Sequence, residues 1–172
     1  MKLNVGKFSL WLNSQLHHYN ERKYWKMRSY VMQEGVTPLK LLYLYKIKRS
    51  DAFNNASMGT DLCSGATFET APHLPHGLNG IIISKYAHIG KNCKIYHQVT
   101  ITTKCINGKF VSAVIGGNCT LGAKSTIIAG VTIGNNVIVG ANAVVTHDVP
   151  DNCVVAGVPA KIIKRLDQNA NY

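Results

Sequence analysis

The chain has 172 residues, 46% of them hydrophobic and 16% charged, which is enough for one domain with a well-buried core. Its formal net charge is +11, from 19 Lys and Arg against eight Asp and Glu. No run approaches the ~20 apolar residues of a membrane-spanning helix, and the apolar stretch near residue 10 is too short for a signal peptide. We therefore expect a cytoplasmic protein.

The positive charge is concentrated in residues 1–50, which hold ten Lys and Arg against only Glu21 and Glu34. An excess of this kind predicts an anionic partner, either an acidic membrane surface or the phosphates of a ligand. A solvated, lysine-rich helical face is the other explanation. The basic residues do not alternate with stacking aromatic residues, and no nucleic-acid-binding motif is present, so we expect no nucleic-acid partner.

Residues 7–49 carry the spacing of helices. Pro38 permits a new helix to begin, because proline is tolerated in a first turn. We therefore expect an N-terminal helical segment over residues 1–55, with a polar connection from Asp51 to Gly59 at its end. The apolar positions that carry the helical spacing are Phe8, Trp11, Leu12, Leu16, Tyr19, Trp25, Tyr30 and Val31.

From Ile83 to Val145 an aliphatic residue occupies every sixth position, with one interruption. A period of six fits neither a helix nor an ordinary strand. It is typical of a mainly β solenoid in which each hexad forms one side of a triangular coil and stacked coils bury one another's apolar faces. A sandwich of short strands would not hold one strict period over so many segments. The positions are Ile83, Ile89, Ile95 and Ile101, then Ile115, Leu121, Ile127, Ile133, Val139 and Val145.

The turns between hexads are rich in Gly and Asn, which tolerate left-handed backbone angles. Leu62, Phe68 and Leu74 extend the period backwards, so we expect the solenoid to span residues 56–150. Three extra residues between Leu74 and Ile83, and a longer loop at 102–113, predict extruded segments, which often lie on a binding face. Residues 151–172 are expected to close the open end and continue as a basic helix or arm.

Asp61 and His76 form the candidate catalytic pair. They are fifteen residues apart and a coil takes about eighteen, so we expect them to lie close together in neighbouring layers. A carboxylate that orients an imidazole base is an arrangement that deprotonates a hydroxyl group. A buried, purely structural Asp–His pair would have the same spacing, and the spacing alone leaves both interpretations open.

The remaining histidines and the cysteines suggest no metal site. His73 is able to assist His76 or to cap a turn. His88 and His97 would need a third imidazole to build a zinc site between subunits, and their spacing matches no such site. The five cysteines show no metal spacing and no evident pairing, so we interpret them as structural thiols.

The hexads, followed by Asn-Ala-Val-Val-Thr-His-Asp-Val-Pro-Asp-Asn-Cys-Val-Val-Ala-Gly-Val-Pro-Ala-Lys, resemble the end of hexapeptide-repeat acyltransferases. The segment Leu74-Pro-His-Gly-Leu-Asn-Gly-Ile-Ile-Ile is similar to the serine acetyltransferase branch, and the resemblance covers about residues 57–164. It implies a left-handed parallel β-helix, a homotrimer, and acetyl-CoA in the groove between adjacent subunits.

The resemblance also implies roles for individual residues. His76 would be the general base and Asp61 its carboxylate partner, with direct transfer of the acetyl group in a ternary complex. Thr103, Ala123 and Ala141 fall at the positions whose backbone groups hold the thioester arm. Lys161 and Lys164 suit the phosphates of coenzyme A, where an ammonium acts as a point charge.

Three positions depart from the serine acetyltransferase pattern. Pro75 stands where that branch has Asp, and Val111 and Ser112 stand where it has an Arg-His pair that engages the amino acid. A site without those charges leaves the ammonium and carboxylate of serine unpaired, which disfavours serine strongly. The sequence therefore predicts an O-acetyltransferase of sugars or surface-polysaccharide precursors. The alternatives are a serine O-acetyltransferase of cysteine biosynthesis and a non-catalytic trimeric scaffold.

Overall fold

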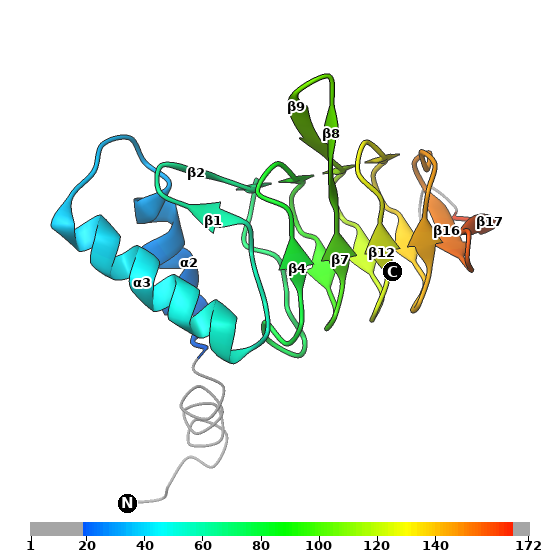
Figure 1. Cartoon of the computed structure of the whole chain (residues 1–172). Coiled ribbons are helices and arrows are strands. Elements are labelled where there is room, and N and C mark those ends of the chain that lie inside the picture. The colour runs from blue at the N-terminus through cyan, green and yellow to red at the C-terminus, as the bar shows by residue number, and fades with distance from the viewer. Residues whose placement is uncertain (1–18, 167–172) are drawn as a thin grey trace, which may run out of the picture.

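The computed structural model describes residues 19–166, which form a solenoid of stacked triangular coils with a layer of two helices at one end. Figure 1 shows the helices at the left, the coils running away from them, and a hairpin that projects sideways from the middle of the solenoid. The fold is mainly β, a left-handed parallel β-helix, as the six-residue period and the resemblance predicted.

The helical layer consists of α2 (Glu21–Val31) and α3 (Pro38–Phe53). Asn20 caps α2 by accepting a hydrogen bond from the backbone N–H of Lys23 at 3.0 Å, and Thr37 caps α3 in the same way. Pro38 occupies the first turn of α3, which confirms the predicted new start. The helical positions Phe8, Trp11, Leu12 and Leu16 lie outside the described residues. Neither described helix has the length and apolar character needed to span a bilayer.

Three parallel sheets form the sides of the prism, and we number them I to III. Sheet I contains β4 (Ile82–Ile83), β7 (Thr100–Ile101), β12 (Thr126–Ile127) and β15 (Val144–Val145). Sheet II contains β3 (Thr67–Phe68), β5 (His88–Ile89), β10 (Val114–Ile115) and β13 (Thr132–Ile133). Sheet III contains β6 (Lys94–Ile95), β11 (Thr120–Leu121), β14 (Ile138–Val139), β16 (Cys153–Ala156) and the antiparallel β17 (Lys161–Arg165). Two hairpins, β1 (Thr60–Asp61) with β2 (Ser64–Gly65) and β8 (Thr103–Ile106) with β9 (Lys109–Ser112), leave the prism.

The aliphatic residues of the six-residue period stack directly on one another in the core. In sheet I, Ile83 pairs with Ile101, which pairs with Ile127 and then Val145. Each is at most 2% exposed, and the matching positions of sheets II and III are equally buried from Ile89 and Ile95 onward, whereas Phe68 in the first coil is only partly buried. Each coil of three hexads therefore supplies one aliphatic side chain to each of three vertical stacks, and no coil completes its core without a neighbour.

The edge between sheets II and III depends on asparagine. Asn92, Asn118, Asn136 and Asn152 all have φ between 55° and 58°, a conformation that Asn tolerates better than most residues. Their side chains pair between coils, since Asn92 donates to Asn118 at 3.3 Å and Asn136 donates to Asn152 at 3.0 Å. The edge is thus held by side-chain amides as well as by the parallel ladders.

The period does not begin where the sequence suggested. Met58, not Leu62, occupies the first sheet I position: Ser57 bridges Ile82 in parallel, and Met58 is fully buried. Leu62 lies in the turn of the β1–β2 hairpin and is only half-buried. The expectation for Leu62 was wrong because the hairpin inserts extra residues between the Met58 and Phe68 positions.

The basic tail closes the far end as a strand. After β16 the chain turns at residues 157–160, and β17 returns antiparallel along sheet III, where Ala156 pairs with Lys161 and Val154 with Lys164. Of the two forms predicted for this segment, the structure therefore shows an arm rather than a helix.

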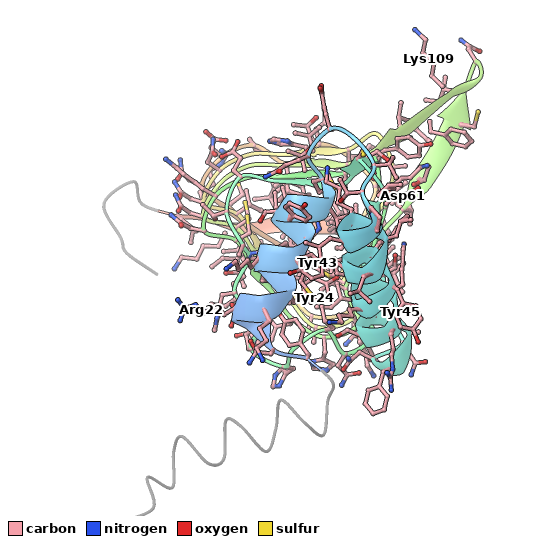
Figure 2. The ribbon with its side chains drawn as sticks, turned by 90° about the vertical axis from the view of Figure 1, so that its left-hand side faces the viewer. Arg22, Tyr24, Tyr43, Tyr45, Asp61 and Lys109 are labelled. Atoms are coloured by element: carbon pink, nitrogen blue, oxygen red, sulfur yellow. The ribbon has the colours of Figure 1, made fainter. Side chains whose placement is uncertain are left out.

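A buried polar network joins the helices to the first coil. The Tyr24 hydroxyl donates to Asp51 Oδ1 at 2.6 Å, and the Arg28 Nε–H donates to Thr60 Oγ1 at 2.9 Å. Burial raises the pKa of Asp51 above its ordinary value, although the hydrogen bond from Tyr24 opposes that shift. Burial also raises the pKa of Tyr24 and lowers that of Arg28. Figure 2 shows Tyr24 between the two helices.

Replacing Tyr24 by Phe should lower the free energy of unfolding by about 1–3 kcal/mol, because it removes a hydrogen-bond donor from a buried carboxylate. Denaturant unfolding followed by circular dichroism measures the change. Tyr45→Phe, at an exposed position of α3, is the matched control and should change stability by less than about 0.5 kcal/mol. Equal effects of the two substitutions would show that the Tyr24–Asp51 bond does not support the helical layer.

Candidate functional site

Three of the predicted site residues lie along a single edge of the prism, where sheet III turns into sheet I. His76 lies there in the segment between His73, which bridges Lys94 of sheet III, and β4. Ala123 lies in the turn between β11 and β12, and Ala141 in the turn between β14 and β15. The turn at residues 157–160 continues this edge, because Ala160 donates its N–H to the carbonyl of Val144 at 2.8 Å.

The edge is long enough to bind an extended ligand and carries polar side chains at its two ends. From the coil of His76 to the turn at residues 157–160 there are four coil spacings, or about 19 Å at ~4.8 Å each. Ala123 and Ala141 present only methyl groups there, and both are at least partly exposed. Lys161, which follows the last turn, is exposed at the far end from His76. Lys164 lies three residues further along β17.

The contacts of the His76 ring come from the next coil. The ring centroid lies 5.0 Å from that of His97 in an edge-on arrangement and 5.9 Å from that of Tyr96. His76 itself is exposed, whereas His97 is half-buried and its Nδ1 is buried without a hydrogen-bond partner in the described structure. His76 is therefore an accessible imidazole whose position is restricted by two other rings.

Asp61 and Thr103 lie on a different edge, where sheet I turns into sheet II. Asp61 ends β1, and its carboxylate lies 3.8 Å from the ammonium of Lys85 in the next coil. Thr103 begins β8, and its hydroxyl is hydrogen-bonded to that of Ser84. Figure 2, which looks along the solenoid, shows Asp61 on the same side as Lys109 at the tip of the β8–β9 hairpin.

The structure thus does not bring Asp61 and His76 together within one chain. The β1–β2 hairpin takes up part of the fifteen residues that separate them, so His76 does not complete a full coil above Asp61. The two residues lie on separate edges of the prism, and a side of the prism separates their edges. Their catalytic roles remain predictions, and the expected contact between neighbouring layers of one chain is not present.

The β8–β9 hairpin is the predicted extruded loop, and contacts at its base hold it. The Ser112 hydroxyl donates to the carbonyl of Thr102 at 2.6 Å, and the Thr102 hydroxyl accepts from the N–H of Ala129 at 2.8 Å. Phe110 stacks on Tyr86 of the neighbouring turn, with ring centroids 5.3 Å apart and planes 11° apart. Val111 and Ser112 are uncharged, and the charged residue at the hairpin base is Lys104, which pairs with Val111 across the hairpin.

Among the described residues, His73, His88 and His97 lie apart from one another. His88 lies on the outer face of sheet II, where its Nε2 is 3.3 Å from Glu69, while His97 belongs to the edge between sheets III and I. Within residues 19–166 no group of three or more His, Cys, Asp or Glu is arranged to hold a metal ion. His73 contributes its backbone to a bridge with Lys94. The buried thiols of Cys93 and Cys119 approach backbone carbonyls in the turns, in keeping with a structural role.

Sequence reasoning gave no role beside His76 to Tyr96 and His97. A signal was available: His97 follows His76 by 21 residues, which is one coil of eighteen plus the three extra residues before Ile83. It also gave Lys85 no role as a partner of Asp61. That contact depends on the β1–β2 hairpin, which no sequence period predicts.

Comparison with known proteins defines the class of the fold. Residues 112–147 match the family described as bacterial transferase hexapeptide (six repeats). A serine acetyltransferase from Synechococcus elongatus is 32% identical over 107 residues, covering 62% of this chain and 43% of the relative. The solved serine acetyltransferase of Neisseria gonorrhoeae has a TM-score of 0.64 and 28% identity, covering 92% of this chain and 59% of that one.

A galactoside O-acetyltransferase from Escherichia coli is 42% identical over 69 residues, covering 38% of this chain and 34% of the relative. The chain spans about half or less of the length of the curated relatives it matches. The longer matches carry the name serine acetyltransferase, and the shorter one carries the name galactoside O-acetyltransferase.

The Phe110–Tyr86 stack should control how often the hairpin opens. We expect Phe110→Ser to raise the rate of tryptic cleavage after Lys109 by about two- to tenfold, because such a ring pair contributes about 0.5–1.5 kcal/mol. Ile106→Ser removes another exposed apolar residue of the hairpin and serves as the control. Mass spectrometry of the fragments gives the rates, and equal acceleration in the two variants would contradict an anchoring role for the stack.

Proposed function

We propose that this protein is an acetyl-CoA-dependent O-acetyltransferase whose site forms between two copies of the chain. The observation that carries the proposal is the separation of the predicted residues onto two edges. His76, Ala123 and Ala141 lie along the edge between sheets III and I. Asp61, Thr103 and the projecting hairpin lie along the edge between sheets I and II.

His76 acts as the general base. Its imidazole takes the proton from the acceptor hydroxyl while that oxygen attacks the thioester carbonyl. The carbon–sulfur bond then breaks, the acetyl group stays on the acceptor oxygen, and the imidazolium returns the proton to the leaving thiolate. His97 and Tyr96 keep the His76 ring in place, and the small side chains of Ala123 and Ala141 leave room for the extended thioester arm of acetyl-CoA. Lys161 and Lys164 supply positive charge for its phosphates.

A homotrimer supplies the second edge. In a cyclic trimer each contact is heterologous, so one edge of a chain meets a different edge of its neighbour. Such a contact brings Asp61 and the hairpin of one copy to His76 of the next, which the geometry of one chain does not allow. The carboxylate is then able to orient the imidazole and stabilise its protonated form.

Serine is the acceptor that the longer matches support. A hydroxyl of a sugar or of a surface-polysaccharide precursor is the second candidate. It is favoured by the absence of charge on Val111 and on the hydrogen-bonded Ser112, which offer no partner for the ammonium of serine. The 42% identity with a galactoside O-acetyltransferase supports the same candidate.

Mixing two inactive variants tests the shared site. His76→Ala should lower the rate of thiol release from acetyl-CoA by about 10²–10⁴-fold, the contribution of a general base, and Asp61→Ala should lower it about tenfold or more. Co-expressed, the two variants should regain activity at about a quarter of the sites, because a randomly assembled ring pairs one intact His76 with one intact Asp61 at that frequency.

The control co-expresses His76→Ala with the double variant His76→Ala/Asp61→Ala, in which no chain supplies the base, and it should regain nothing. Failure of the first mixture to recover, with mixed trimers present by native mass spectrometry, would show that the two residues do not act across two chains. Full activity of His76→Ala alone would remove the base from the mechanism, and absence of acetyl-CoA binding would favour the scaffold.

The acceptor is identified by thiol release with L-serine and with a panel of free, nucleotide-linked and lipid-linked sugars. For serine we expect saturation with a KM between about 1 μM and 1 mM, the usual range for an enzyme and its substrate. Saturation by a sugar without turnover of serine would select the second candidate. Hydrolysis of acetyl-CoA at the same rate with and without every acceptor would contradict both.

A further inference from the structure

The helix α3 packs one face against the protein and exposes apolar side chains on the opposite face. On the inner face, Ile47 is fully buried and Asp51 accepts the hydrogen bond from Tyr24. On the outer face, Leu41, Leu42 and Tyr45 are 50%, 47% and 62% exposed. At about 100° per residue, Leu41 and Leu42 lie within about 60° of Tyr45, so the three side chains form one continuous patch. A surface helix of a globular protein normally carries polar residues on this side.

Basic residues surround that patch. By the same helical geometry Arg49 and Lys48 also lie within about 60° of Tyr45, and Lys46 lies about 100° from it. All three are exposed. The only acidic residue of α3 is Asp51, which is buried on the inner side. We define the outer face of α3 as Leu41, Leu42, Tyr45, Lys46, Lys48 and Arg49.

The position of this face leaves it accessible at the end of the solenoid. Figure 1 shows the helices at the opposite end from β16 and β17. In Figure 2 the helical layer faces the viewer, with Tyr45 and Arg22 on opposite sides of it. The outer face belongs to the helical layer and none of its six residues is among the predicted site residues, although Figure 2 shows Tyr45 on the same side of the molecule as Asp61.

We propose that the outer face of α3 docks on an anionic lipid surface. The exposed Lys and Arg attract anionic headgroups, and the exposed leucines and tyrosine between them are able to insert below those headgroups. A second copy of the chain is the other apolar partner to consider. Isologous pairing of two copies, with this face against itself, would set Arg49, Lys48 and Lys46 against the same cations, which is unfavourable.

The test is co-sedimentation of the full chain with vesicles of phosphatidylcholine alone and of phosphatidylcholine with phosphatidylglycerol. We expect binding to the anionic vesicles only, weakened by raising the salt from 50 to 500 mM. Leu41→Gln/Leu42→Gln/Tyr45→Gln should weaken it about tenfold or more, and so should Lys46→Gln/Lys48→Gln/Arg49→Gln. All six positions are exposed, and circular dichroism verifies that the helices persist.

The matched control is Arg22→Gln/Lys23→Gln/Lys26→Gln, which removes three exposed positive charges from α2. Binding by net charge alone would weaken equally in this control and in the α3 basic variant, and that result would overturn the proposal. Absence of binding to anionic vesicles would overturn it as well. A third outcome would assign the face to contact between copies of the chain. In that case the protein would not bind vesicles, it would associate with rising concentration in ultracentrifugation, and Leu41→Gln/Leu42→Gln/Tyr45→Gln would abolish this association. Thiol release from acetyl-CoA should be the same in all three variants, so the lipid proposal and the catalytic proposal fail independently.

Discussion

The structure depends on the vertical stacking of aliphatic side chains inside the prism, because a single coil is too thin to bury a core alone. Each coil contributes one aliphatic residue to each of three columns, and in sheet I this column runs from Met58 through Ile83, Ile101 and Ile127 to Val145. Since each residue buries itself against the coils above and below, the coils gain stability only together. This requirement fixes the spacing of six and leaves the edges free to vary.

The difference between regular core positions and variable edges explains which parts of the fold could be predicted from the sequence. The aliphatic residues from Ile83 to Val145 predicted the solenoid, because a core position that is repeated on every side of every coil recurs in the sequence once per hexad. Leu62 misled because the β1–β2 hairpin interrupts the period just where Met58 takes the buried position. The form of the tail was not encoded in any period, since β17 is fixed by its pairing with β16.

The same difference decides which parts of the candidate site could be predicted from the sequence. The positions of Ala123 and Ala141 in one row followed from the regular coils, which place residues eighteen apart on the same edge. The partners of His76 and Asp61 did not follow, because both residues lie in or beside irregular segments. Only the coordinates show that His97 and Tyr96 flank the first and that Lys85 meets the second. A repeating sequence pattern is least able to place side chains that lie in the irregular segments.

Both ends of the solenoid are covered, and this has a consequence for solubility. A bare parallel sheet presents unpaired N–H and C=O groups at each end, a template onto which further copies add without limit. Here Arg28 binds the carbonyl of Ala66 at one end, and at the other β17 covers β16 while the residue 157–160 turn occupies the backbone groups of Val144. Lys161 and Lys164 then place positive charge on the outermost strand. These contacts oppose growth of the sheets into fibres at the two ends of the stack.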